Sequence, residues 1–432
     1  MADVEAARDT SRATRPTRRQ AVACARPFEP AEQTALAFYE RGCLSAYATG
    51  FTWPRSTTAA FTARLLGRMF GPPAAGALSR RTVPTLPGDA VRSFTSIDVG
   101  RTVASALGLR GLEDRLWERD DHRFSQLAAE RVLPSCDTIH GIEHSSLELF
   151  QAAKASGRAT VLHVASVHPT FHDEIFDRAY REHPEFQESL AWRLRERRLR
   201  RDARRIKEYE LADLLVTWSR FSSRSLTTHG VPADRVVIVP LGAAPVPPLA
   251  TPAPGDMTRS GPLRVMFAGK ISFHKGCHVL LEAWSLFDSR DAGLVLAGHN
   301  ELPPALTAAR GVELAGSLPQ AGLFSLMNQC DLLVLPTLSD SFGMVITEAL
   351  MHGLPVLTTA NAGAADLIVE GRTGWIVPAG DAAVLCARLR WCEANLAEVR
   401  DMRERVRGSV TPRTWSDYRA DLRTTLRERD LL

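Results

Sequence analysis

Two carboxylates lie eight positions apart in residues 338–357, which read LSDSFGMVITEALMHGLPVL. Asp340 precedes the apolar run, and Glu348 lies within it. Burying an unpaired carboxylate costs free energy, so such a group is normally paired, hydrogen-bonded or used for binding. A carboxylate in this setting can accept hydrogen bonds from hydroxyl groups, such as those of a ribose. The alternative for Glu348 is a solvent-facing position on a helix.

Two lysines follow a glycine in residues 267–276, FAGKISFHKG. Lys270 and Lys275 come after a strand-like run that ends at Gly269 and ahead of a helical pattern. Cations at this position suit a phosphate or a diphosphate, although a pair of solvated surface lysines is the alternative. Neither a Walker loop nor a GxGxxG sequence accompanies them, so an ordinary NTPase or dinucleotide site is not indicated.

A second candidate anion site follows the strand-like run at 331–336. The backbone N–H groups that open the next helix belong to Ser341, Phe342, Gly343 and Met344. A helix N-terminus attracts anions, and a glycine there permits close approach of a ligand. Both anion sites follow strands of one predicted sheet, so they can converge on a single diphosphate.

Three histidines lie close together in residues 159–174. His163 ends a strand-like run, and His168 and His172 follow in the next loop. Each is a candidate for contact with a reacting group, and a structural or solvated histidine is the alternative. Their irregular spacing matches no zinc helix or ribbon, so no metal is predicted.

The elements that carry these residues are apolar runs without alternation, each followed by a helical pattern. In the second half of the chain, strands are expected at 263–268, 292–298, 312–318, 331–336, 354–359 and 373–378, with helices at 277–287, 320–330, 342–353 and 381–395. In the first half, strands are expected at 136–141, 159–166, 213–219 and 235–242. This pattern predicts α/β architecture with doubly wound parallel sheets.

Residues 244–262 contain six prolines and no apolar periodicity, which predicts a linker. We therefore expect two Rossmann-like domains that face each other across a cleft. The predicted segments are a disordered tail at 1–20, a first Rossmann-like domain at 21–243, the linker at 244–262, a second Rossmann-like domain at 263–411 and a helix at 412–432 that crosses back to the first domain.

Composition limits the class of protein. The 432 residues are 45% hydrophobic and 24% charged, with a net charge of +4, which is typical of a soluble globular protein and does not favour nucleic-acid binding. Seven scattered cysteines without a CxxC pair indicate reduced thiols. The apolar runs are too short to cross a bilayer, and residues 1–20 lack the apolar core of a secretion signal. A cytoplasmic location is predicted.

Residues 192–210 carry eight arginines and one lysine. The favoured interpretation is a solvated helix with ion pairs to Glu196, Asp202 and Glu208. The alternative is a peripheral contact with anionic lipid or guidance of an anionic acceptor.

Residues 333–359 resemble the Glu-x7-Glu signature of glycosyltransferase family 4, a group of retaining enzymes with the GT-B fold. Residues 267–284 resemble the Gly-Arg-…-Lys-Gly element of the same family, with Lys270 in place of the arginine. The resemblance extends over residues 130–420, and the earlier residues match poorly.

The resemblance implies a role for each matching residue. Lys275 is expected to bind the donor diphosphate, Glu348 the nucleotide ribose and Asp340 the donor sugar. The implied nucleotide-sugar contacts are Gly269, Lys270, Lys275, Leu318 beside the base, Asp340, Ser341, Phe342, Gly343, Met344 and Glu348. On the acceptor side, His163 resembles the family's histidine near the reacting sugar, and His168 is its competitor.

The implied reaction moves a sugar from a nucleoside diphosphate donor (UDP-, GDP- or similar) to a hydroxyl of a sugar, lipid-linked or natural-product acceptor, with retention and without a metal cofactor. The catalytic candidates are His163, His168, Lys275 and Asp340. Two alternatives stay open: a sugar-nucleotide epimerase or hydrolase on the same fold, and an inactive protein that only binds nucleotide sugars.

Overall fold

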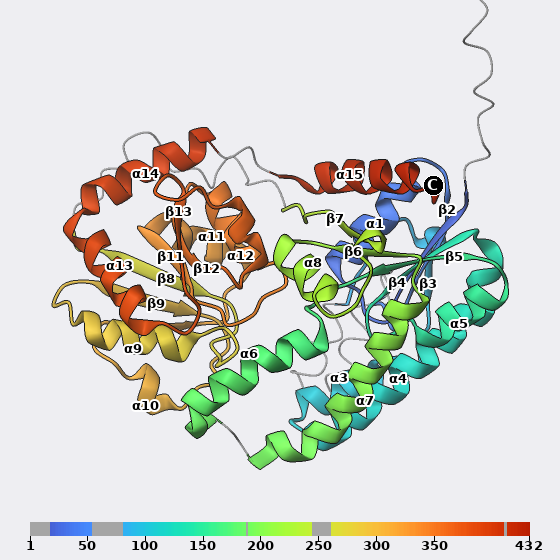
Figure 1. The fold of residues 1–432 in the computed structure, drawn as a ribbon, viewed down its shortest axis with the longest axis horizontal. Helices are drawn as coiled ribbons and strands as arrows, with labels where there is room; N and C mark the ends of the chain where they lie inside the picture. Colours follow the sequence, from blue (N-terminus) through green and yellow to red (C-terminus); the bar gives the residue numbers. More distant parts are fainter. Residues whose placement is uncertain (1–17, 54–80, 187–188, 244–260, 410–412) are drawn as a thin grey trace, which may run out of the picture. The chain divides into compact units, whose positions relative to one another are not determined.

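The computed structural model describes residues 18–53, 81–186, 189–243, 261–409 and 413–432 (Figure 1). Most of the predicted tail and linker lies outside these ranges. The chain forms two compact units, here called unit 1 and unit 2. Unit 1 comprises Met1–His163, Ala203–Leu215 and Arg419–Leu432, and unit 2 comprises Val164–Asp202 and Val216–Tyr418.

The first sheet has seven strands in the order β3-β2-β1-β4-β5-β6-β7. The strands are Gln20–Cys24 (β1), Leu44–Thr49 (β2), Val91–Ser93 (β3), Thr138–Ile142 (β4), Ala159–His163 (β5), Leu214–Thr217 (β6) and Val236–Ile238 (β7). β1 pairs in parallel with both β2 and β4. The strand order therefore reverses between β1 and β4, which is a topological switch point.

Helices connect these strands. They are Glu29–Tyr39 (α1), Val99–Ala106 (α3), Arg110–Arg131 (α4), Leu147–Ala155 (α5), Pro169–Glu182 (α6), Ser189–Leu211 (α7) and Arg220–Thr227 (α8). The sequence predicted β4 to β7 but not the elements before residue 130. β1 reads QAVAC and β2 reads LSAYAT, and these small and polar residues carry little strand signal.

The second sheet has six strands in the order β10-β9-β8-β11-β12-β13. The strands are Arg264–Ala268 (β8), Gly293–Ala297 (β9), Val312–Gly316 (β10), Leu332–Leu335 (β11), Val356–Thr359 (β12) and Gly374–Val377 (β13). Each predicted strand of the second half is present, and the recorded pairings are parallel. The prediction of two doubly wound α/β sheets is confirmed.

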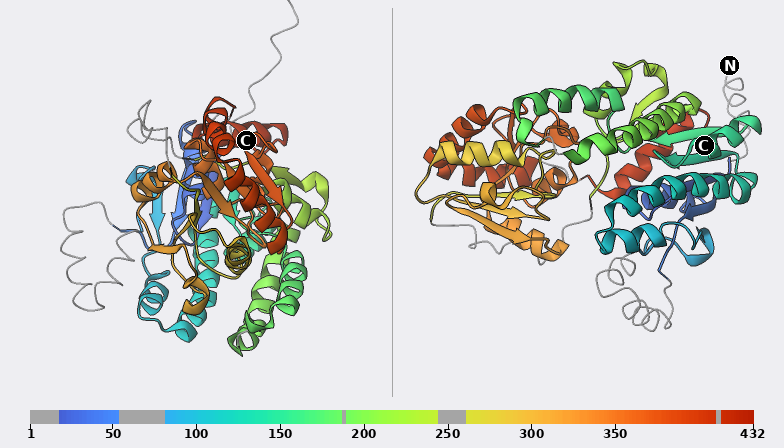
Figure 2. Two further views of the ribbon diagram at one scale, coloured as in Figure 1. Left: turned by 90° about the vertical axis from the view of Figure 1, so that its left-hand side faces the viewer. Right: turned by 90° about the horizontal axis from the view of Figure 1, so that it is seen from below.

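The helices of this half are Cys277–Phe287 (α9), Pro304–Thr307 (α10), Gln320–Gln329 (α11), Met344–Met351 (α12), Ala382–Ala394 (α13), Leu396–Ser409 (α14) and Trp415–Glu428 (α15). Because the strand order grows outward from β8 in both directions, right-handed crossovers place helices on both faces of the sheet. Figure 2 shows this arrangement. Among the helices of the described ranges, none is both long and apolar enough to cross a membrane.

Two glycines bring the loops at the carboxyl edge of this sheet together. A Cβ on Gly276 would lie 1.9 Å from the carbonyl oxygen of Pro336, so the loop after β8 touches the end of β11. A Cβ on Gly298 would lie 1.7 Å from the carbonyl oxygen of Gly269, so the loop after β9 touches the loop after β8. Glycine is needed at both positions because any side chain would overlap backbone.

The last residues of the chain belong to unit 1. Arg419 and Arg423 of α15 each form an ion pair of 2.9 Å with Glu40, at the end of α1. The carbonyl oxygen of Leu431 accepts a hydrogen bond of 2.9 Å from the side-chain amide of Gln20 in β1. Leu431 thus lies beside β1, the first strand in the sequence.

Candidate functional site

The loops after β8 and β11 bring Lys275 and Asp340 together. The ammonium of Lys275 forms an ion pair with Oδ2 of Asp340. The Lys275 side chain is 29% exposed and that of Asp340 is 14% exposed, so the pair lies near the surface of unit 2. A ligand that carries an anion to Lys275 would therefore compete with Asp340 for the ammonium.

Backbone hydrogen bonds hold Asp340 at the start of α12. Its N–H donates to the carbonyl of Asn361 over 2.9 Å, and its own carbonyl accepts from the N–H of Gly363 over 2.9 Å. The Oδ1 atom accepts a hydrogen bond of 3.3 Å from the N–H of Phe342. Gly343 follows with a φ of +84°, a left-handed conformation that suits glycine. The carboxylate therefore lies in the turn from which α12 begins.

The rest of the α12 turn is only partly available to a ligand. Phe342 is 3% exposed, and the Ser341 hydroxyl donates a hydrogen bond of 2.7 Å to the carbonyl of Ala165. Met344 and Glu348 are half-buried on the first and second turns of α12. Glu348 thus lies on the same short helix that begins beside Asp340.

Lys270 has a different partner from Lys275. Its ammonium lies 3.0 Å from a carboxylate oxygen of Glu301, and its side chain is 59% exposed. Gly269, before it, has a φ of +134°. Leu318 follows the end of β10 and is 37% exposed. The predicted donor-side residues therefore all lie in loops or helix starts after strands of one sheet, but the two lysines engage different carboxylates.

The structure places each of the three predicted histidines against a different histidine. Nε2 of His163 lies 3.1 Å from Nδ1 of His140. The rings of His168 and His229 stack at 4.9 Å. The ring of His172 lies 6.1 Å from that of His274, which precedes Lys275. Within the residues that the structure describes, no three His, Cys, Asp or Glu side chains gather as metal ligands, and the absence of a metal cofactor stays a prediction from the sequence.

His163 belongs to a buried chain of hydrogen bonds in unit 1. Nε2 of His140 lies 2.9 Å from Oε1 of Gln20, whose amide nitrogen donates to the carbonyls of Arg18 and Leu431. An amide oxygen can only accept, so His140 carries its proton on Nε2. Burial lowers the pKa of His163 to about 3 and that of His140 well below its usual value, so both rings are neutral. His163 must then donate from its own Nε2.

His168 begins α6 and is almost fully buried. Its Nδ1 accepts a hydrogen bond of 3.2 Å from the N–H of Thr170, and its N–H donates to the Ser225 hydroxyl over 2.9 Å. Accepting from a backbone N–H requires an unprotonated Nδ1. His168 therefore caps helix α6 in unit 2, and the residue is 5% exposed.

An aromatic cluster that the sequence did not predict supports the Lys275 loop. Phe273 is 7% exposed and stacks on Tyr180 at 4.9 Å and on His278 at 4.2 Å. Leu338, two residues before Asp340, belongs to the same buried cluster. The only signal in the sequence is an aromatic residue inside a polar loop. This packing ties the loop after β8 to the loop after β11 within unit 2.

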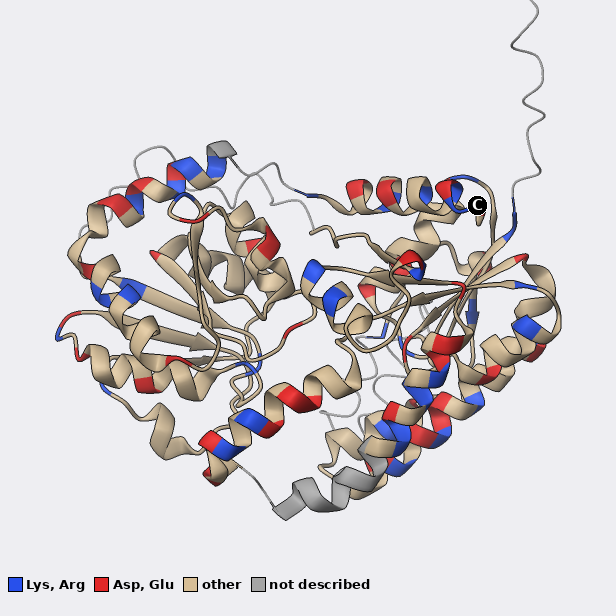
Figure 3. Ribbon diagram, viewed as in Figure 1, with Lys and Arg blue, Asp and Glu red and all other residues tan. Residues whose placement is uncertain are grey.

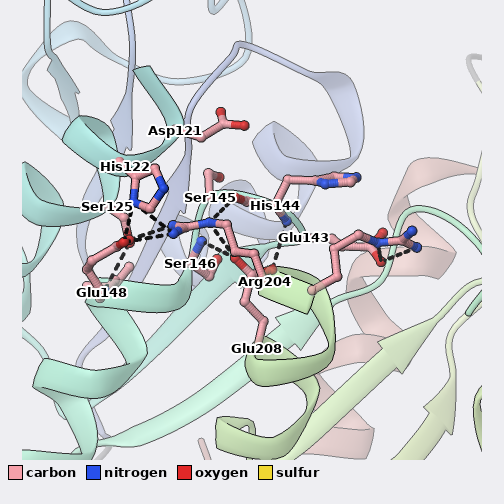
Figure 4. A network of polar contacts seen from close by, with 12 residues as sticks. Asp121, His122, Ser125, Glu143, His144, Ser145, Ser146, Glu148, Arg204 and Glu208 are labelled. Atoms are coloured by element: carbon pink, nitrogen blue, oxygen red, sulfur yellow. Dashed lines mark hydrogen bonds and ion pairs between the residues drawn. The ribbon is translucent and has the colours of Figure 1, made fainter. Parts of the chain in front are cut away.

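The arginine-rich helix differs from the solvated helix that we predicted. In the carboxyl-terminal part of α7, Arg204, Arg205 and Glu208 are buried. Arg204 binds Glu148 with its Nη1 atom at 2.7 Å, while a carboxylate oxygen of Glu143 lies 2.7 Å from Nη2 of Arg205. Figure 3 shows charges of both signs along α4 and α7, and Figure 4 shows the network around Arg204. Of the predicted ion pairs, the one between Arg204 and Glu208 is present, with Nε and Oε1 3.7 Å apart. The prediction of a solvated position is wrong for Arg204, Arg205 and Glu208. The side chain of Glu196 lies outside the described residues.

Burial and pairing have opposite effects in this network. Burial raises the pKa of Glu208 to about 8, against the hydrogen bonds from the N–H groups of Ser146 and His144 and the attraction of Arg204. Burial also acts to raise the pKa of Glu148, but the hydrogen bonds and charge of Arg204 outweigh it and hold that pKa at about 2. Glu148 therefore stays ionised and anchors Arg204.

Known proteins resemble this chain in fold, and the sequence match to a protein family falls on the second sheet. Residues 262–395 match the family model described as "Glycosyl transferases group 1". The two parallel sheets form the GT-B fold of the solved glycosyltransferase structures that the chain resembles. The residues that match the family model comprise the second sheet with α9 to α13.

Two curated relatives show how far the sequence similarity extends. The amylovoran biosynthesis glycosyltransferase AmsK of Erwinia amylovora is 26% identical over 205 residues, which is 43% of this chain and 50% of the relative. A D-inositol 3-phosphate glycosyltransferase of Pseudarthrobacter chlorophenolicus is 30% identical over 205 residues, 42% of this chain and 48% of the relative. The chain thus spans about half the length of the curated relatives that it matches.

The structural similarity covers nearly the whole chain. HepE from Anabaena, solved in complex with UDP and glucose, superposes with a TM-score of 0.61 at 17% identity, over 95% of this chain and 100% of that one. At this identity the similarity shows the fold alone.

Proposed function

We propose that this protein is a retaining glycosyltransferase of family 4 that moves a sugar from a UDP-sugar to a hydroxyl of an acceptor. The observation that carries the proposal is the meeting of Lys275 and Asp340 at the N-terminus of α12, with Glu348 on the same helix. The glycosyltransferase relatives and the UDP-bound HepE structures support a nucleotide-sugar donor.

The ion pair suggests how the donor enters. The diphosphate takes the ammonium of Lys275, which leaves the Asp340 carboxylate able to accept hydrogen bonds from hydroxyls of the donor sugar. Glu348 accepts from the ribose hydroxyls, the backbone of Gly343 and Met344 approaches phosphate or sugar, and Leu318 lies beside the base. When Lys275 leaves Asp340 for the diphosphate, one residue thus binds the phosphate side of the diphosphate–sugar bond and the other binds the sugar side.

In the reaction, the bond between the sugar C1 and the phosphate oxygen breaks while the acceptor oxygen bonds C1 from the same face. The acceptor proton passes to the leaving phosphate, so no protein carboxylate needs to act as a nucleophile. Lys275 and the N-terminus of α12 stabilise the charge that grows on the diphosphate. Each preorganised donor of this kind contributes about 2.7–4 kcal/mol to lowering the barrier.

Lys270 and the histidines have less direct support. Lys270 supplies charge without the bidentate fork of an arginine, and Glu301 shares that charge. His163 and His168 are both proposed for the acceptor side, in unit 1 and unit 2 respectively. Burial lowers the pKa of His163 to about 3, which limits His163 to hydrogen bonding near neutral pH.

The test is turnover with a defined panel. The protein is incubated with UDP-glucose, UDP-galactose or GDP-mannose, with glucose, galactose, mannose, their phosphates and their octyl glycosides as acceptors. We expect acceptor-dependent release of UDP that Lys275→Ala and Glu348→Gln each reduce at least a hundredfold. Lys207→Ala, which removes an exposed lysine from α7, is the matched control and should keep full turnover.

The outcomes separate the alternatives. Stabilisation by UDP without turnover on any combination would favour the inactive binding protein. Conversion or hydrolysis of the donor at a rate independent of acceptor would favour the epimerase or hydrolase. Full turnover in both the Lys275 and the Glu348 variants would refute the site.

A further inference from the structure

His144 has a backbone conformation that is unfavourable for its residue type. Its φ is +81°, in the left-handed region that glycine adopts readily and that histidine rarely does. A non-glycine residue held in this region costs about 1–3 kcal/mol and persists only when the surrounding structure enforces it. His144 is the second residue after β4 ends at Ile142.

The Arg204–Glu208 pair of α7 holds both sides of this residue (Figure 4). The N–H of His144 donates to Oε2 of Glu208 over 2.8 Å, and the carbonyl of His144 accepts from Nε of Arg204 over 2.8 Å. The other oxygen of Glu208 accepts from the N–H of Ser146 over 2.8 Å. Nε of Arg204 lies 3.7 Å from Oε1 of Glu208. The buried side chains of Arg204 and Glu208 therefore fix the peptide groups that flank His144.

A loop that only connected β4 to α5 would not need a histidine in this conformation. Glycine would adopt the same conformation without strain, so backbone geometry alone does not call for histidine at position 144. Burying Arg204 and Glu208, which are 9% and 0% exposed, also costs desolvation free energy. Both costs serve to present one particular side chain, the imidazole of His144.

The imidazole lies where open α/β sheets bind ligands. β4 is one of the two strands at the switch point of the first sheet, and ligands bind beyond the carboxyl ends of the strands there. Figure 4 shows the His144 side chain pointing away from the Arg204–Glu208 pair. The residue is half-buried, so it combines a fixed position with contact to solvent.

We propose that the His144 imidazole hydrogen-bonds a sugar hydroxyl of the acceptor, and that the Arg204–Glu208 pair is a positioning device for it. The inference rests on the proposed transferase function and assigns unit 1 a residue that selects the acceptor. A neutral imidazole offers one donor and one acceptor nitrogen, which together can recognise a hydroxyl group.

The decisive variant is His144→Gly, because it removes the imidazole and the strain together. We expect the melting temperature to rise by about 2–4 °C. The kcat/KM for the acceptor should fall about five- to tenfold, the effect of one lost hydrogen bond. The KM for the UDP-sugar and the acceptor-independent hydrolysis of the donor should not change. His144→Ala keeps the strain, so it should lose the same activity without the gain in melting temperature.

Asp288→Gly is the matched control. Asp288 is exposed after α9 and also has a positive φ, of +45°. Its replacement reports the balance between relief of strain and the added chain entropy of glycine, and it should leave transfer unchanged. A His144→Gly protein with an unchanged acceptor kcat/KM, or with a lower melting temperature, would overturn the inference.

Failure of the proposed function gives a different result. A wild-type protein without any acceptor-dependent turnover refutes the function itself. The acceptor sugars of the panel are then titrated while the NMR signals of the His144 imidazole are followed. If none of them shifts those signals, the inference fails as well.

Discussion

At the scale of single residues, the buried imidazoles show how hydrogen bonding decides what a histidine can do. Gln20 fixes the tautomer of His140, and His140 fixes that of His163. A proton added to Nδ1 of His140 would break its hydrogen bond from His163, and a proton added to either ring would bury a charge. If His163 acts on the acceptor side, it does so as a neutral ring with its lone pair on Nδ1.

Nitrogen NMR of histidine-labelled protein checks this assignment. We expect His163 to show the Nε2–H tautomer and to remain neutral from pH 8 to pH 5, because burial lowers its pKa to about 3. A midpoint near the ordinary histidine pKa of about 6.5 would contradict the assignment. So would an Nδ1–H signature.

A second residue-scale prediction concerns Glu208. Its two oxygens accept from the N–H groups of His144 and Ser146, so Glu208→Gln would turn an N–H₂ group against one of these donors. We expect a loss of about 1–3 kcal/mol in the free energy of unfolding, measured by urea denaturation. Glu210→Gln makes the same change at an exposed position of α7 and should cost less than 0.5 kcal/mol. Equal losses in the two variants would show that the buried hydrogen bonds contribute nothing specific.

At the scale of elements, the start of α12 depends on Gly343. A Cβ there would have its closest contacts at 3.5 Å, so space is not the constraint, but the φ of +84° is. Gly343→Ala should cost about 1 kcal/mol and turn the N–H groups of α12 away from the donor. Gly371 has a φ of +69° and nothing within 4 Å of a Cβ, so Gly371→Ala is its matched control.

The comparison between these variants is what tests the site. Both should lose similar stability in thermal unfolding, but only Gly343→Ala should raise the KM for the UDP-sugar, by about tenfold. If Gly371→Ala raises it equally, the effect belongs to general destabilisation. An unchanged KM in Gly343→Ala would separate the α12 N-terminus from donor binding.

Elements also explain how much could be predicted from the sequence. The second sheet was predictable because strands such as Leu332–Leu335 are continuous apolar runs that end at proline or glycine. β1 and β2 lacked that signal, since alanine is the commonest of their buried residues and no continuous run of large apolar residues marks either strand. The ion pair between Lys275 and Asp340 was not predictable, because the close approach of Gly276 to Pro336 sets it and spacing in the sequence does not.

The same limit applies to His144 and to the helix α7. Nothing in the pattern EHSS indicates a left-handed histidine, since that conformation follows from a clamp some 60 residues later in the chain. Charged residues at helical spacing predict a solvated face by default. Arg204 and Arg205 depart from it because their carboxylate partners are supplied by the segment after β4.

At the scale of the whole molecule, buried neutral histidines set how the protein responds to acid. Burial lowers the pKa of His163 and His278 to about 3 and that of His352 to about 4, and it also lowers the pKa of His140 well below its usual value. In the unfolded chain each ring has a pKa near 6.5. Between pH 6.5 and about 4, the unfolded state therefore binds more protons than the folded state. The free energy of unfolding must decrease as the pH falls through this window.

The size of this effect can be measured and assigned. Each histidine contributes up to about 1.4 kcal/mol for each pH unit below 6.5, so the melting temperature should fall steeply between pH 6.5 and pH 4.5. His352 allows the assignment, because in the described part of the chain neither of its ring nitrogens has a hydrogen-bond partner and its ring packs on Phe324 at 4.4 Å. His352→Leu removes a buried polar group without breaking a hydrogen bond. It should raise the melting temperature at pH 5 more than at pH 8, whereas an equal gain at both values would mean that proton uptake by this histidine does not contribute to acid unfolding.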